Sequence, residues 1–100
     1  MTRKLELAGF KAILHSELPA LSEQYGVNSI EVFGSYARQQ QNEESDLDLL
    51  VTFHKTPGLL KFVKLENHLS DLLGIKVDLV MKDALKPNIG QRIIKEAVAV

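Results

Sequence analysis

Short runs of β-forming residues alternate with long amphipathic segments along this chain, and this alternation is the strongest constraint on its fold. Residues 28–33, 47–53 and 76–81 are rich in aliphatic and aromatic residues and have the length of strands. Residues 4–25 and 59–73 instead carry apolar side chains at spacings of three and four, the period of a helix with one buried face. The sequence therefore predicts an α+β fold in which helices cover a small sheet.

Glycine and proline mark the ends of these segments. Gly26 and Gly74 follow the two long helical patterns, where a glycine cap is common. Pro19 lies inside the first pattern and has no N–H group, so we expect it to kink or restart that helix. Residues 86–88 break the chain, and residues 89–98 are predicted to form a last helix. The expected order is α-β-(short α)-β-α-β-α, with a mixed sheet of three strands or slightly more.

Composition narrows the class of protein. One hundred residues suit a single domain at 1–100, and 45% hydrophobic with 25% charged residues is ordinary for a soluble globular protein. The absence of cysteine excludes disulfides and thiolate metal sites. A net charge of -1 gives no general attraction to nucleic acid or to a membrane, so neither is expected as a partner. No segment is typical of a signal peptide or a membrane span, so a cytoplasmic protein is expected.

Three aspartates are the candidate catalytic and metal-binding residues. Asp46 and Asp48 stand at the start of the second predicted strand and, being two positions apart, point to one face. Asp78 lies within the third predicted strand and joins that face if the two strands pair. At ~5 Å and an effective dielectric of about 20, each like-charged pair costs roughly 3 kcal/mol. A divalent ion such as Mg²⁺ relieves this repulsion, and two such ions can clamp the oxygens of a phosphoryl displacement.

Gly34 and Ser35 follow the first predicted strand and precede a short helical turn at residues 36–38. A glycine there lets the backbone come close to a phosphate, and the N–H groups of the turn and the Ser35 hydroxyl can bind anionic oxygens. Arg38 falls one turn later and can face the same anion. These three residues are therefore candidates for binding the phosphates of a nucleoside triphosphate.

Residues 34–51 resemble the signature of the minimal nucleotidyltransferases of the polymerase-beta superfamily. The Gly-Ser pair is followed after ten residues by Asp-x-Asp, and a third aspartate lies in a later strand. Similarity to segments of that family is also found at residues 25–27, 76–80, 85–87, 92–93 and 96–98, so the resemblance covers nearly the whole chain. It implies a polymerase-beta palm-like fold, a metal role for the three aspartates and a phosphate role for the Gly-Ser pair.

The resemblance also implies a reaction and a partner. Such domains are often antitoxins paired with a helical HEPN-type RNase toxin, and they transfer AMP from ATP onto a tyrosine of that toxin. ATP as substrate, Mg²⁺ as cofactor and a HEPN-type toxin as partner are therefore expected. Many relatives have glycine after the arginine, where this chain has Gln39, and the loop is expected to be stiffer here.

Other interpretations of the same residues stay open. The domain could neutralise a toxin by covering it, with weak or no catalysis, or could be half of a two-chain transferase acting on a small molecule or RNA. Ser35 could also cap the turn after Gly34, and Arg38 could instead pair with Glu43 or Glu44 at the surface. The apolar tail at residues 97–100 is expected to lie in the core or at a packing edge, and it could instead be part of a protein interface.

Overall fold

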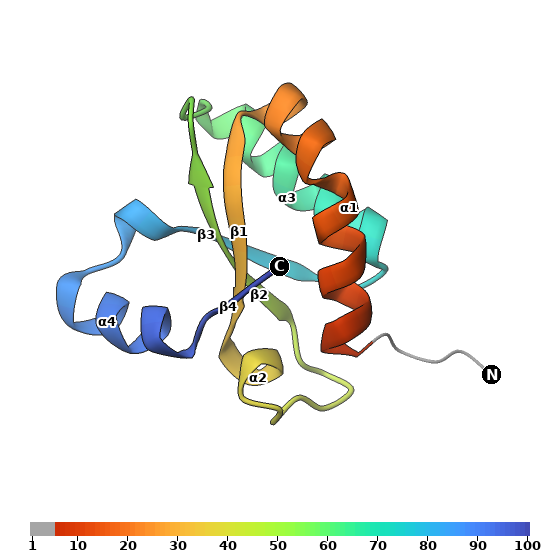
Figure 1. The fold of residues 1–100 in the computed structure, drawn as a ribbon, viewed down its shortest axis with the longest axis vertical. Helices are drawn as coiled ribbons and strands as arrows, with labels where there is room; N and C mark the ends of the chain where they lie inside the picture. Colours follow the sequence, from red (N-terminus) through yellow and green to blue (C-terminus); the bar gives the residue numbers. More distant parts are fainter. Residues whose placement is uncertain (1–5) are drawn as a thin grey trace.

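The computed structural model describes residues 6–100, and of residue 89 only the backbone. Figure 1 shows a central sheet with α1 and α3 side by side on one of its sides and α4 on the other. No helix in this range is long and apolar enough to span a bilayer. In chain order the elements are α1 (Leu7–Tyr25), β1 (Val27–Phe33), α2 (Gly34–Ala37), β2 (Leu47–Phe53), α3 (Leu59–Leu73), β3 (Val77–Met81), the 3₁₀ turn η1 (Lys82–Ala84), α4 (Pro87–Glu96) and β4 (Val98–Ala99).

The sheet is mixed, as predicted. Its strand order is β3-β2-β1-β4, with β1 antiparallel to both β2 and β4 and β2 parallel to β3. Helix α3 connects the parallel pair, because two parallel strands cannot be joined by a tight turn. The α+β class and the three predicted strands are confirmed, and β4 is an additional strand.

The first helix differs from its prediction at Pro19. The helix continues through this residue and does not restart there. Pro19 is exposed, so the carbonyl oxygen that loses its N–H partner can be hydrated, while Leu14 and Leu21 on either side are buried and hold the helix to the core. Residues 4 and 5 of the predicted helix lie outside the described range. Gly26 caps α1 in the left-handed conformation, at φ 74°, as predicted.

The predicted bounds of the last helix were wrong. The last helix begins at Pro87, whose missing N–H group is no loss at a first helical position, and ends at Glu96 rather than residue 98. Val98 and Ala99 then form β4, pairing with Val32 and Glu31 of β1. The free edge of β1 accepts this short apolar tail, which satisfies backbone groups that would otherwise face solvent. The expectation that the tail lies at a packing edge is confirmed.

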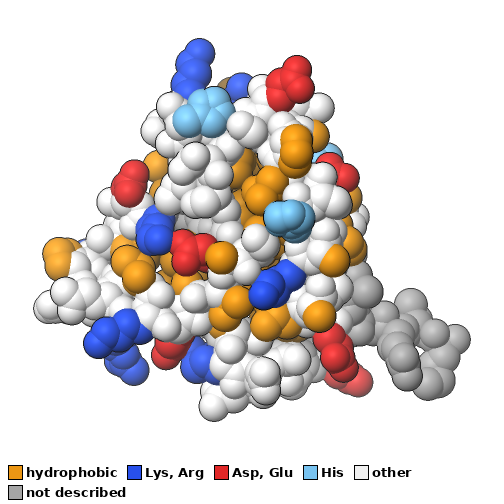
Figure 2. Space-filling view, in the orientation of Figure 1, with side chains coloured by type: hydrophobic (Ala, Val, Ile, Leu, Met, Phe, Trp, Pro, Cys, Tyr) orange, Lys and Arg blue, Asp and Glu red, His pale blue; other side chains and the backbone are white. Residues whose placement is uncertain are grey.

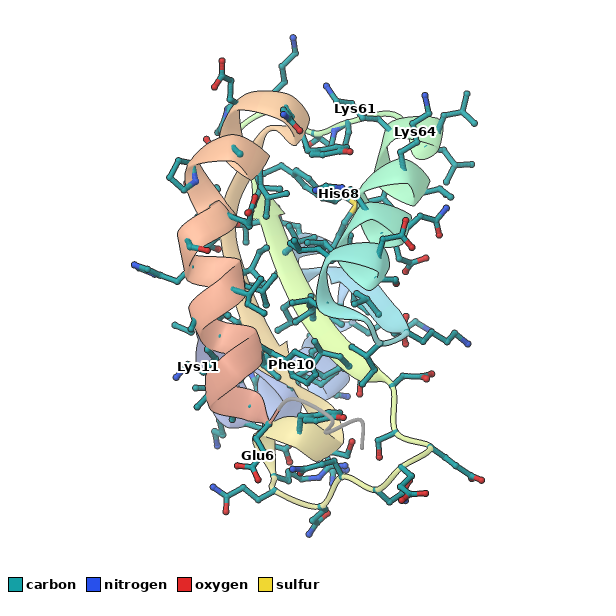
Figure 3. All side chains as sticks on the ribbon, turned by 90° about the vertical axis from the view of Figure 1, so that its right-hand side faces the viewer. Glu6, Phe10, Lys11, Lys61, Lys64 and His68 are labelled. Carbon is teal, nitrogen blue, oxygen red and sulfur yellow. The ribbon has the colours of Figure 1, made fainter. Side chains whose placement is uncertain are left out.

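The core fills the space between the sheet and the pair α1 and α3, and Figure 3 shows Phe10 of α1 pointing into it. Alternate residues of the strands face this core, so the intervening residues face the other side of the sheet, where α4 lies. Asp48 and Asp78 occupy such intervening positions. The buried strand residues of the core are Val27, Ile30, Val32, Leu47, Leu49, Val51, Val77 and Leu79, and the buried helix residues are Phe10, Leu14, Leu21, Tyr36, Leu65, Leu69 and Leu73.

Candidate active site

The three predicted aspartates gather at one end of the sheet. Asp48 and Asp78 are register partners in the parallel pair of β2 and β3, so their side chains lie on the same face. Asp46 comes one residue before β2. On the other side of Asp48, its partner in β1 is Phe33, the residue that leads into the Gly34 turn. The fold therefore brings the carboxylates and the glycine-serine turn together.

Gly34 packs directly against Asp48. Its φ of +74° lies in the left-handed region, which disfavours any residue with a Cβ. A Cβ built at Gly34 would also overlap the Asp48 carboxylate, with Oδ2 as the nearest atom. Two constraints thus require glycine here, namely the left-handed backbone conformation and the close approach to the carboxylate.

The electrostatics of Asp48 are unfavourable to its own ionisation. Burial raises the pKa of Asp48, the negative charges of Asp78 and Asp46 raise it further, and the positive charge of Arg38 lowers it. The two acidic neighbours and burial together outweigh Arg38, so negative charge is in excess around this half-buried carboxylate. A cation placed between these side chains would supply it.

The donor set fits a hard divalent cation by its chemistry. All three groups are carboxylates, and Mg²⁺ is commonly held by one or two carboxylates together with substrate phosphates. Asp78 is exposed, and the Asp46 side chain is half-exposed and reaches Lys76 Nζ at 3.8 Å. Among residues 6–100, no three His, Asp or Glu side chains already surround one point as preformed ligands. The carboxylates are therefore neighbours that an ion would draw together.

The phosphate-binding candidates occupy α2 and the residue that follows it. Ser35 is the second residue of α2, a helix whose N-cap is Phe33 and which has no side-chain cap, so the interpretation of Ser35 as a cap is wrong. The structure gives Arg38 a partner distant in sequence: Arg38 Nη1 donates to Glu96 Oε2 at 3.1 Å, and Nε donates to Gln40 Oε1 at 3.3 Å. Arg38 is thus fixed between the turn and α4.

Sequence reasoning missed the contribution of α4 to this site. A pocket of about 330 Å³ lies between α2 and α4 and is lined by Arg38, Asn88, Arg92, Ile93 and Glu96. The spacing of apolar and charged residues in α4 showed an amphipathic helix, but nothing local indicated which surface it would meet. Figure 2 shows Lys and Arg side chains at the lower left of the molecule, where α4 lies in Figure 1.

Gln39 has a backbone conformation that glycine adopts more easily. Its φ is 58°, and no other non-glycine residue among those described has a positive φ. Glycine adopts this conformation without strain, whereas a residue with a Cβ does so at a cost of about 1–2 kcal/mol. The backbone thus follows a path suited to glycine even though glutamine is present.

Comparison with known proteins gives consistent results. The sequence profile of the nucleotidyltransferase domain matches residues 17–100. The chain is 47% identical over 96 residues to the protein adenylyltransferase MntA of Thermococcus cleftensis, covering 96% of this chain and 97% of the other.

Two solved structures share the fold. One, described as a candidate minimal nucleotidyltransferase, superposes with a TM-score of 0.82 at 33% identity and covers 99% of this chain and 100% of its own. Another is a chain of a toxin-antitoxin complex with AMP-PNP, with a TM-score of 0.67 at 24% identity, covering 88% of this chain and 66% of its own. The second likeness concerns the fold alone.

Proposed function

This chain belongs to the nucleotidyltransferase domain family, and we propose that it is a Mg²⁺-dependent protein adenylyltransferase that moves AMP from ATP onto a tyrosine of a HEPN-type toxin. The observation that carries the proposal is the meeting of Asp48, Asp78 and Gly34 at one end of the sheet. The 47% identity to a protein adenylyltransferase supports a protein as acceptor. In this role the domain is an antitoxin.

Each group of the site has a task in this reaction. Asp46, Asp48 and Asp78 would hold one or two Mg²⁺ ions, which supply positive charge at the α-phosphate when bound. The N–H groups at the start of α2 and the Ser35 hydroxyl bind the phosphate oxygens, and Arg38 adds a guanidinium beside them. The protein acts mainly by positioning and by charge, as in other phosphoryl transfers.

The chemical step is a single substitution at the α-phosphorus of ATP. The tyrosine oxygen forms a bond to the α-phosphorus, the bond from that phosphorus to the bridging oxygen breaks, and pyrophosphate leaves. The phenolic proton must go to a base, and we assign this role to Asp78, which is the exposed member of the three aspartates and is therefore accessible to a protein acceptor.

Labelled ATP tests the proposal. The domain is incubated with Mg²⁺ and its HEPN-type partner, beside the variants Asp48→Asn and Asp71→Asn. Asp71 is an exposed residue of α3, outside the site, and serves as the matched control. We expect label on the partner with the wild type and Asp71→Asn and none with Asp48→Asn.

The same experiment can reject the reaction. Absence of label in every sample, with Asp48→Asn neutralising the toxin as well as the wild type does, would show a binding module without catalysis. If the label is found on a residue of the toxin other than tyrosine, the proposed acceptor is wrong but the transferase activity stands.

A further inference from the structure

The pocket between α2 and α4 lies directly beside the proposed phosphate-binding turn. Arg38 stands on one side of it, one residue after α2, and Arg92 of α4 also lines it. Arg38 is near enough to Asp48 for its charge to lower the pKa of that carboxyl. Arg38 therefore belongs both to the lining of this pocket and to the charged surroundings of Asp48.

The positive charge of Arg92 is uncompensated within the part of the chain that the structure describes. Glu96 lies four residues later on α4, the usual position for a partner on the same helix. That carboxylate instead pairs with Arg38 at 3.1 Å. No ion pair or hydrogen bond joins the Arg92 side chain to any residue in 6–100. An arginine that lines a pocket without a carboxylate partner is suited to an anionic ligand.

The residues that line the pocket are better suited to the phosphates of a nucleotide than to its base. Two guanidinium groups and one amide can bind phosphate oxygens, and guanidinium does so with two parallel N–H groups. Among the lining residues that the structure describes, none is aromatic and the apolar contact comes from Ile93, so a base has no ring to stack on there. The net charge from Arg38, Arg92 and Glu96 is positive. The pocket is thus suited to the polyphosphate end of the ligand and not to its base.

We propose that Arg92 binds the β- and γ-phosphates of the nucleoside triphosphate from the α4 side, opposite Arg38. Helix α4 then completes a site whose other parts come from β1, α2, β2 and β3. This inference rests on the proposed function, because it assigns a further residue to the same nucleotide. Glu96 holds Arg38 at the edge of the pocket and so fixes the second guanidinium.

Binding measurements test this role without requiring turnover. Affinities of the full chain for Mg²⁺ with AMP-PNP, and for AMP, are measured by calorimetry for the wild type, Arg92→Gln, Arg92→Lys and Lys95→Gln. Lys95 is an exposed cation of the same helix that does not line the pocket, so its variant removes an equal charge elsewhere. Circular dichroism checks that α4 remains folded in each variant.

Arg92→Gln should weaken AMP-PNP binding at least about tenfold and leave AMP binding unchanged, because AMP lacks the two phosphates in question. Arg92→Lys should recover part of the loss, and Lys95→Gln should match the wild type. Unchanged AMP-PNP affinity in Arg92→Gln, or an equal loss for AMP, overturns the inference and leaves the proposed transferase standing. Failure of the wild type to bind AMP-PNP would instead reject the proposed function itself.

Discussion

Asp48 of β2 and Asp78 of β3 are register partners in adjacent parallel strands, with the Gly34 turn packed against the first of them. Two carboxylates in this relation are costly to a fold that gains nothing from them, since like charges directly opposite one another destabilise a sheet. The binding of a cation and phosphates that we propose for this site would give a reason for this cost in stability.

Replacing Asp48 with asparagine should separate stability from activity. The pKa of Asp48 is raised above its ordinary value of 3.8, so the folded state binds this proton more tightly than the unfolded chain. The free energy of unfolding therefore falls as pH rises from the ordinary to the raised pKa, and the full loss persists at neutral pH. Asp48→Asn should raise the Tm at pH 7 without Mg²⁺, while transfer falls at least about a hundredfold.

Thermal unfolding in EDTA and in Mg²⁺ checks this prediction. Mg²⁺ should raise the Tm of the wild type by binding its folded state, and it should raise that of Asp48→Asn less. Asp71→Asn should follow the wild type in both conditions. A lower Tm for Asp48→Asn than for the wild type in EDTA would show that the carboxylate contributes to folding rather than opposing it.

Gly34→Ala should be far more damaging than the same change at a glycine of similar backbone conformation. Both Gly34 and Gly74 have positive φ, at 74° and 68°. A Cβ at Gly74 meets no atom, whereas at Gly34 it overlaps the Asp48 carboxylate. Gly74→Ala should lose about 1 kcal/mol from the conformation alone, and Gly34→Ala about 1–3 kcal/mol more from overpacking.

Urea unfolding of the two variants measures this difference, and AMP-PNP binding measures its effect on the site. Gly34→Ala should lose nucleotide affinity because the turn must move away from Asp48, while Gly74→Ala should retain it. Equal free energies of unfolding for the two variants would mean that Asp48 moves aside without loss, and the close packing would then have no structural importance.

The sequence predicted what local patterns determine. Apolar spacings located α1 and α3, alternation located the three main strands, and the two-residue spacing of Asp46 and Asp48 placed them on one face before any pairing was known. That Asp78 joins them depended on β2 and β3 being neighbours, which the α3 crossover makes natural but which no single segment encodes.

What escaped prediction depends on contacts between distant residues. Arg38 and Glu96 are 58 positions apart, and neither residue carries a local sign of the other. The tail at Val98 continued the apolar pattern of a helix, and only the open edge of β1 made it a strand. The left-handed conformation of Gln39 was likewise invisible in the residue itself.

Two ion pairs should differ sharply in their contribution to stability. Lys82 Nζ lies 2.7 Å from Glu31 Oε1, with side chains 29% and 19% exposed, whereas the pair of Lys76 and Asp46 spans 3.8 Å with 79% and 42% exposed. Lys82→Ala leaves a largely buried carboxylate without its partner and should lower the free energy of unfolding by about 1–3 kcal/mol. Lys76→Ala should change it by less than about 0.5 kcal/mol. Urea unfolding at low and high salt checks both values, and equal effects would contradict the argument from burial.

Gln39→Gly should stabilise the domain, although most substitutions by glycine do the opposite. The φ of 58° costs a residue with a Cβ about 1–2 kcal/mol, and glycine removes that strain. Glycine also gives the unfolded chain more freedom, which returns about 0.4–1 kcal/mol of the gain. The free energy of unfolding should therefore rise by about 0.5–1 kcal/mol, measured in urea. Glu44→Gly, an exposed position of the same loop without a positive φ, should lower it instead. A loss of stability in both variants would show that the turn after Arg38 is not strained.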